Sequence, residues 1–234
     1  MTRATGTFAL VFLVAHATAS RAQSSNQNIY PSAEEAAEAL FRAVQARDEQ
    51  GLSQILGEDE DLFSADDEGQ QGIDRQRFVE KYQQMHRLVR EPDGTVLYIG
   101  AENWPFPVPL ISKNGGWSFD TQSGTREILF RRIGANESFA IDVCHALAHS
   151  DERDLANHVG NAAPVHGYYF RALPARGRPA FYIAYPANYR SSGVMTFVVG
   201  RDDVIYERDM GPQTAKLARA TTGFKPDSTW HVLQ

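Results

Sequence analysis

The sequence contains one cysteine, Cys144, in 234 residues. A chain with a single cysteine cannot close an internal disulfide, so packing must supply its stability. The residues around Cys144 are apolar: Phe139, Ile141, Val143 and Leu147. Such neighbours favour a buried thiol that acts as a small apolar side chain, and a reactive thiol or an intermolecular bridge is the alternative.

Positive charge is also scarce. The chain has 23 Lys and Arg against 29 Asp and Glu, a net charge of −6, and no basic run. This balance argues against nucleic acid and anionic membranes as partners. The sequence also lacks the G-x-S-x-G, P-loop, G-x-G-x-x-G and paired-cysteine metal motifs, so it indicates no cofactor and no enzyme of those classes.

No apolar run reaches the ~20 residues that a membrane-spanning helix needs. A short apolar run, residues 8–15, follows Arg3 and precedes Ser20 and Ala22, whose small side chains stand at the two positions that a signal peptidase reads. This pattern predicts a signal peptide over residues 1–22 and a flexible leader over residues 23–31. The protein is therefore expected to be periplasmic or secreted, and not to span a membrane after cleavage.

Residues 32–150 have mostly helical patterns. Ser32 and Glu35 have the spacing of a capping box at the start of a first helix. A second, short helix is expected to stop at Gly57, and Asp74 is expected to cap a third. An apolar stripe with helical spacing follows Asp74: Phe78, Tyr82, Met85 and Val89.

Residues 95–120 predict a bent β-hairpin. Its turn contains Asn114 and two glycines, which accept positive φ, and its return arm alternates apolar and polar residues. Three prolines in the first arm remove donors from the strand ladder. This arm is therefore expected at a sheet edge or bulge, with Trp104 and Phe106 presented outside the ladder.

Residues 125–150 again have helical periodicity, with an expected break at residues 134–136. A polar connector over residues 151–165 leads to residues 166–234, where short aromatic and β-branched runs alternate with turn residues. This spacing predicts an antiparallel four-stranded meander with a short C-terminal helix. The fold class is α+β, and the short connector favours close packing of the two parts, with the rings of both sheets converging near the proline-rich arm.

Six segments have distinctive sequences: WPFPVPL (104–110), GGWSFD (115–120), REILFRRIGANE (126–137), HGYYFR (166–171), YPANYRSSGVMTFVV (185–199) and VIYERDMGP (204–212). Together they span most of the chain after residue 22. They resemble the bacterial exported-protein family called domain of unknown function 2950, although the segment before HGYYFR is shorter here than in that family. The resemblance implies an extracytoplasmic protein of the bacterial envelope with no established activity.

Two looser resemblances concern the fold. Helices followed by a bent hairpin with a W-x-F-D arm are similar to cone-shaped nuclear-transport-factor-2-like folds. The C-terminal pattern of GVMTFVV followed by VIY is similar to the sheet of pilin-type head domains. Analogies of fold carry no function by themselves.

Two groups of side chains are candidates for chemistry. His145 and His149 stand four residues apart on an expected helix, a spacing that can hold a metal ion, but H-E-x-x-H is absent and two surface histidines are favoured. Asp120 at the end of a strand can act as a general base with His166 or His86. The favoured alternative is that Asp120 caps the helix that follows it.

The aromatic inventory is dense, and its candidates for ligand binding are Trp104, Phe106, Tyr168, Tyr185 and Tyr189. Tyr and Trp combine an apolar ring with a polar tip, which suits contacts with peptides, glycans or proteins, and core packing is the alternative. The sequence predicts a non-catalytic binding or assembly module, with an exposed patch around Tyr185 and Tyr189. Its expected partner is an envelope protein, a peptide or a glycan. A small cavity-type hydrolase or isomerase that uses Asp120 is the alternative.

Overall fold

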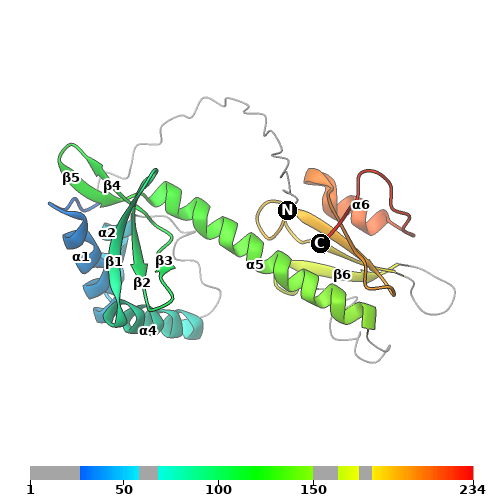
Figure 1. The fold of residues 1–234 in the computed structure, drawn as a ribbon, viewed down its shortest axis with the longest axis horizontal. Helices are drawn as coiled ribbons and strands as arrows, with labels where there is room; N and C mark the ends of the chain where they lie inside the picture. Colours follow the sequence, from blue (N-terminus) through cyan, green and yellow to red (C-terminus); the bar gives the residue numbers. More distant parts are fainter. Residues whose placement is uncertain (1–26, 58–67, 150–162, 174–180, 234) are drawn as a thin grey trace, which may run out of the picture.

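The computed structural model describes residues 27–57, 68–149, 163–173 and 181–233. These residues form two lobes that are joined by one long helix, α5 (Thr121–His149), as Figure 1 shows. The predicted α+β class is confirmed, since helices precede two antiparallel sheets. The expected signal peptide and most of the expected connector lie outside the described residues.

The first lobe begins with three helices, α1 (Ala33–Ala46), α2 (Glu49–Leu56) and α4 (Glu68–Gln84). Ser32 caps α1 by accepting a hydrogen bond from the backbone N–H of Glu35 at 3.1 Å, and Gly57 ends α2, as predicted. The prediction that Asp74 caps a helix is wrong, because α4 begins at Glu68 and contains Asp74. Glu68, Gln70 and Gln71 favour a helix enough for it to continue through Gly69 and Gly72, which disfavour it.

A strand follows α4 where the apolar stripe predicted more helix. The helix ends at Gln84, and β1 (His86–Glu91) pairs antiparallel with β2 (Gly94–Ile99). Val89 lies opposite Val96 in this hairpin. The helical assignment of Val89 is therefore wrong, because pairing with a neighbouring strand overrides a local periodicity that also fits a helix.

The remaining strands are β3 (Trp104–Pro105), β4 (Leu110–Lys113) and β5 (Gly116–Phe119), in the order β1-β2-β4-β5 with β3 also on β2. Asn114 (φ 54°) and Gly115 (φ 79°) form the predicted turn. Residues 106–109 lie outside the strands and β2 meets β4 only at Thr95 and Leu110, but the expectation that Trp104 lies outside the ladder is wrong, because Trp104 pairs with Ile99 of β2. Alternate residues of β2, namely Leu97 and Ile99, are buried in the core beneath α1 and α2.

The second lobe is a meander of β6 (Tyr168–Ala172), β7 (Phe181–Pro186), β8 (Met195–Gly200) and β9 (Ile205–Asp209). The four predicted strands are confirmed, and β10 (His231–Val232) adds an edge strand beside β9 that was not predicted. The C-terminal half of α5 packs on one face of this sheet, and α6 (Thr214–Ala220), which follows the turn η2 (Gly211–Gln213), packs on the other.

Helix α5 is continuous, so the expected break at residues 134–136 is wrong. Asn136 does not cap a new helix there, and its side-chain amide donates to the carbonyl oxygen of Ser192 at 2.9 Å. Gly124, near the start of α5, faces Val108 of the first lobe, whereas Cys144 and its neighbours belong to the core of the second lobe. The second half of α5 therefore belongs to the second lobe. No helix among the described segments is long and apolar enough to cross a membrane.

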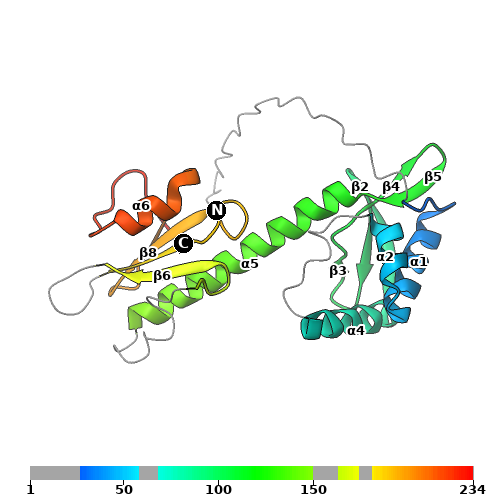
Figure 2. The ribbon, with the colours of Figure 1, turned by 180° about the vertical axis from the view of Figure 1, so that it is seen from behind.

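The two sheets do not share a core, and the expectation that their rings converge near the proline-rich arm is wrong. Figures 1 and 2 show the sheets at opposite ends of α5. The helix has 29 residues, which gives it a length of about 43 Å. Each sheet already packs one face against helices of its own core, so neither core needs the other lobe to form.

The contact between Gly124 and Val108 is expected to hold α5 on the first lobe. A Cβ at Gly124 would lie 2.6 Å from a methyl carbon of buried Val108, whose branched side chain cannot turn away freely. We expect Gly124→Ala to lower the free energy of unfolding by about 1–3 kcal/mol. Urea unfolding followed by the fluorescence of Trp104 and Trp117, both in the first lobe, measures this effect.

Gly134→Ala is the matched control on the same helix. A Cβ there has no atom within 4 Å, so this change should raise stability by up to ~1 kcal/mol through helix propensity alone. Equal effects of the two substitutions would contradict the role of the Val108 contact.

Candidate functional site

A groove of about 750 Å³ opens on the first lobe, and we call it the arm groove. The floor is the face of β2 that points away from α1 and α2, where Val96 and Tyr98 lie. One wall is the proline arm, residues 105–109, and the other is the first part of α5, residues 123–131. The turn between β1 and β2 closes one end of the groove.

The proline arm is a stiff wall, because each proline ring fixes its own φ. Phe106 holds the arm to the sheet: its backbone N–H donates to the carbonyl oxygen of Leu97 at 2.8 Å. The ring of Phe106 also meets Phe78 and Phe119 edge-on, with ring centroids 5.7 and 6.0 Å away. Phe106, which the sequence singled out as a candidate ligand contact, is therefore half-buried and lines the groove.

Arg131 ties α5 to the arm and so sets the width of the groove. Its Nη1 donates to the carbonyl oxygen of Pro105 at 2.9 Å, and its Nε donates to Glu127 Oε1 at 2.8 Å. The guanidinium also lies over the ring of Trp104, 5.2 Å from the ring centre. Trp104 is 39% exposed and packs against Phe106, so it stands beside the groove.

The end of the groove at the β1–β2 turn is anionic. Glu91 and Asp93 both line it. The hydroxyl of Tyr98 donates to Glu91 Oε1 at 2.6 Å, and this bond raises the pKa of Tyr98. Asp93 makes no hydrogen bond or ion pair with the part of the chain that the structure describes.

Phe130 is a lining residue that the sequence did not single out. It lies on α5 at the groove and is 65% exposed, which is unusual for a large aromatic side chain. Its neighbours Ile128, Leu129 and Ile133 suggested one buried helical face. Sequence periodicity could not show that this stretch of α5 spans the gap between two lobes.

The predicted exposed patch around Tyr185 and Tyr189 is not present. Tyr185 is buried on the α6 side of the second sheet, and Tyr168 is fully buried on the α5 side, where its hydroxyl donates to the carbonyl oxygen of Met195 at 2.8 Å. Both faces of the meander are covered by helices, which is why these rings became core residues. Tyr189 is half-buried, and its hydroxyl donates to Asp209 Oδ2 at 3.0 Å.

The predicted partners of Asp120 are not brought to it. Asp120 caps α5, as the favoured alternative predicted: the backbone N–H of Ser123 donates to Oδ1 at 3.2 Å, and the Ser123 hydroxyl donates to Oδ2 at 2.7 Å. His166 lies in the second lobe against Phe139, with ring centroids 4.1 Å apart. His86 stacks on Tyr82 at 4.0 Å.

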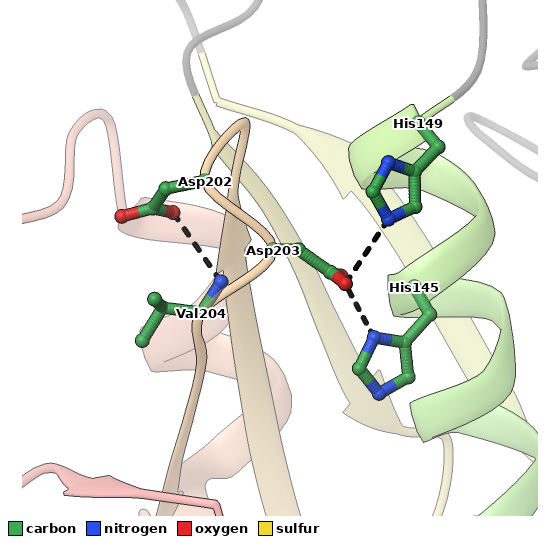
Figure 3. Close-up of polar contacts among 5 residues, drawn as sticks. All are labelled: His145, His149, Asp202, Asp203 and Val204. Atoms are coloured by element: carbon green, nitrogen blue, oxygen red, sulfur yellow. Dashed lines mark hydrogen bonds and ion pairs between the residues drawn. The ribbon is translucent and has the colours of Figure 1, made fainter.

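His145 and His149 both bind one carboxylate, that of Asp203 in the turn between β8 and β9 (Figure 3). His145 Nδ1 lies 2.7 Å from Oδ1, and His149 Nε2 lies 3.0 Å from Oδ2. These hydrogen bonds hold the pKa of Asp203 below its ordinary value. Within the described ranges, no three or more His, Cys, Asp or Glu residues are placed to hold a metal ion.

Cys144 is fully buried, as predicted, and burial raises the pKa of its thiol to about 12. The thiolate is the reactive form of cysteine, so a thiol of such high pKa is inert at neutral pH.

Glu137 fastens the second lobe to α5. Its Oε1 accepts hydrogen bonds from the backbone N–H groups of Val194 (2.8 Å) and Met195 (3.0 Å) at the start of β8. Asn136, one residue earlier, binds the same loop at Ser192. The end of the REILFRRIGANE segment thus contacts the YPANYRSSGVMTFVV segment, a pairing that the sequence alone did not indicate.

A model of the DUF2950 family, described as proteins of unknown function, matches residues 27–160 and 148–233. No curated protein and no solved structure matches the chain.

Removal of the Glu137 carboxylate is expected to loosen the second lobe. Glu137→Ala leaves two backbone N–H groups without their acceptor, which should cost about 2 kcal/mol of unfolding free energy. Glu137→Gln keeps a carbonyl acceptor and should cost less than half as much. Urea unfolding followed by the fluorescence of Trp230 in the second lobe compares them, and an equal loss in both variants would show that the acceptor is not what matters.

Asp203 is expected to make the second lobe sensitive to acid. The folded-state pKa of Asp203 lies below the ordinary value of 3.8. The carboxylate therefore stabilises the folded protein fully well above pH 3.8, and this stabilisation is lost as pH falls through the lowered pKa. Asp203→Asn has no carboxylate to protonate at this position. The difference in the free energy of unfolding between wild type and Asp203→Asn should therefore change over this pH interval. The measurement is the urea midpoint of the second lobe from about pH 6 down to about pH 2. A constant difference between the two proteins would contradict the role of the carboxylate.

Proposed function

The chain belongs to the DUF2950 family, and we propose that it is a non-catalytic binding or assembly module that acts outside the cytoplasm. The arm groove is its ligand site, and the ligand is a segment of an envelope protein, with a glycan as the other class. The observation that carries this proposal is the exposed ring of Phe130 above a groove with fixed walls.

The dimensions and lining of the groove support binding. Ligand sites are commonly concave, of roughly 300–1,000 Å³, and lined mainly by apolar side chains with a few polar groups. The arm groove has about 750 Å³, aromatic and proline walls, and charged groups at its rim. Its walls are held by hydrogen bonds from Phe106 and Arg131, so a ligand would not need to order them.

The polar groups of the groove support a binding role over a catalytic one. Glu127 is paired with Arg131, and Glu91 accepts from Tyr98. Asp120, the residue proposed for general-base chemistry, is engaged by Ser123. A general base needs a lone pair within reach of a substrate proton, and these three carboxylates already have structural partners, whereas Asp93 at the β1–β2 turn has none among the described residues.

The extracytoplasmic location in this proposal is supported by the amino-terminal pattern of residues 1–22. Mass spectrometry of the amino terminus of protein recovered from intact cells tests it, since cleavage after Ala22 is the expected result.

The likeness of the first lobe to nuclear-transport-factor-2-like folds and of the second sheet to pilin heads belongs to the same proposal. The order of helices and strands within each lobe supports this likeness of fold.

Phe130→Ala is expected to weaken ligand binding about tenfold or more, because exposed aromatic side chains in concave sites carry much of the binding energy. Ligands are first selected on wild type with a random peptide display library and a glycan array. Their affinities for wild type and Phe130→Ala are then compared by isothermal titration.

Leu217→Ala is the matched control. Leu217 is a large apolar residue that is 42% exposed, and it lies on a helix, α6, outside the groove. It should leave the affinities unchanged. If Phe130→Ala leaves the affinities of the selected ligands unchanged, the groove is not their binding site.

A further inference from the structure

The anionic end of the arm groove has carboxylates but no cation to neutralise them. Asp93 has no partner among the described residues, and only Oε1 of Glu91 is engaged. The nearby Arg87 is occupied: its Nε donates to Asn103 Oδ1 at 2.9 Å, and its guanidinium lies over Tyr98. Arg90 lines a neighbouring cavity that Glu91 and Asp93 also line, but it forms no ion pair with either carboxylate in the part of the chain that the structure describes. This end therefore suits a positively charged group of a ligand.

The middle of the groove suits an extended peptide that forms no strand ladder. A peptide that added a strand along the arm would need backbone N–H donors from it, and Pro105, Pro107 and Pro109 have none. A polyproline II peptide needs no ladder, and such peptides dock on aromatic surfaces with little loss of conformational entropy. Tyr98, Phe106 and Phe130 provide such a surface.

The wall formed by α5 offers a donor for the peptide backbone. Arg126 is exposed, and its only described bond is from Nη2 to the hydroxyl of Ser123 at 3.0 Å. A polyproline II peptide keeps its carbonyl oxygens free, and a guanidinium can donate to them.

We propose that the arm groove binds an extended, proline-containing segment of a partner protein, with a Lys or Arg of that segment placed between Glu91 and Asp93. This inference rests on the proposed function and adds the class of ligand. The ligand lies along Tyr98, Phe106 and Phe130, and its carbonyl oxygens face Arg126.

The test uses the full chain and a fluorescein-labelled peptide of alternating prolines and leucines with one arginine at its amino end. Two peptides of equal length serve as comparisons, one with Glu in place of Arg and one with Gly in place of each Pro. Fluorescence anisotropy should show that both bind more weakly. Asp93→Asn should weaken the arginine peptide about threefold and leave the glutamate peptide unimpaired, since an exposed charge pair contributes modestly.

Lys113→Gln, at the end of β4, is the charge control and should change neither affinity. Absence of binding by the arginine peptide, equal binding of the three peptides, or indifference to Asp93→Asn would overturn the inference. In that case the proposed function is still tested separately, by the ligands that the display library and the glycan array select. If they depend on Phe130, the groove is a binding site for another class of ligand, such as a glycan, and if none does, both proposals fail.

Discussion

The attachment of α5 to the first lobe is the constraint on which the rest of the structure depends. Gly124 allows the helix to lie against Val108, and Arg131 then reaches the carbonyl oxygen of Pro105. These two contacts direct α5 away from the first sheet instead of across it. The arm groove exists because the helix and the proline arm are held apart at a set distance, with Phe130 above the opening.

The same helix carries the second lobe by a different set of interactions. Its C-terminal half supplies apolar residues to the second core, Glu137 holds the start of β8, and both His145 and His149 hold the turn at Asp203. The polar residues that looked available for chemistry are therefore structural groups of α5 and its contacts. Asp93, which has no hydrogen-bond or ion-pair partner among the described residues, and the exposed Phe130 both line the arm groove of the first lobe, and this combination favours binding there.

Local features were predictable from the sequence because the interactions that cause them span only a few residues. Ser32 and Glu35 form the predicted cap, Asn114 and Gly115 form the predicted turn, and residues 106–109 lie outside the strands after Pro105 has paired with Tyr98. Asp120 also follows this rule, since its bonds reach only to Ser123. Of the predicted binding residues, Phe106 lines the groove just after β3, and Trp104 lies beside the groove although it pairs with Ile99 of β2 in the ladder.

The sequence by itself determined the α+β class, the helix caps, the hairpin turns and the burial of Cys144, all of which depend on near neighbours along the chain. Tertiary structure decided which faces of the helices and strands pack against another element. It made Val89 a strand residue, placed Tyr168 and Tyr185 under helices, and left Phe130 exposed. These outcomes depend on contacts between residues far apart in the sequence, and a hydrophobic pattern shows that a face is apolar without showing what covers it.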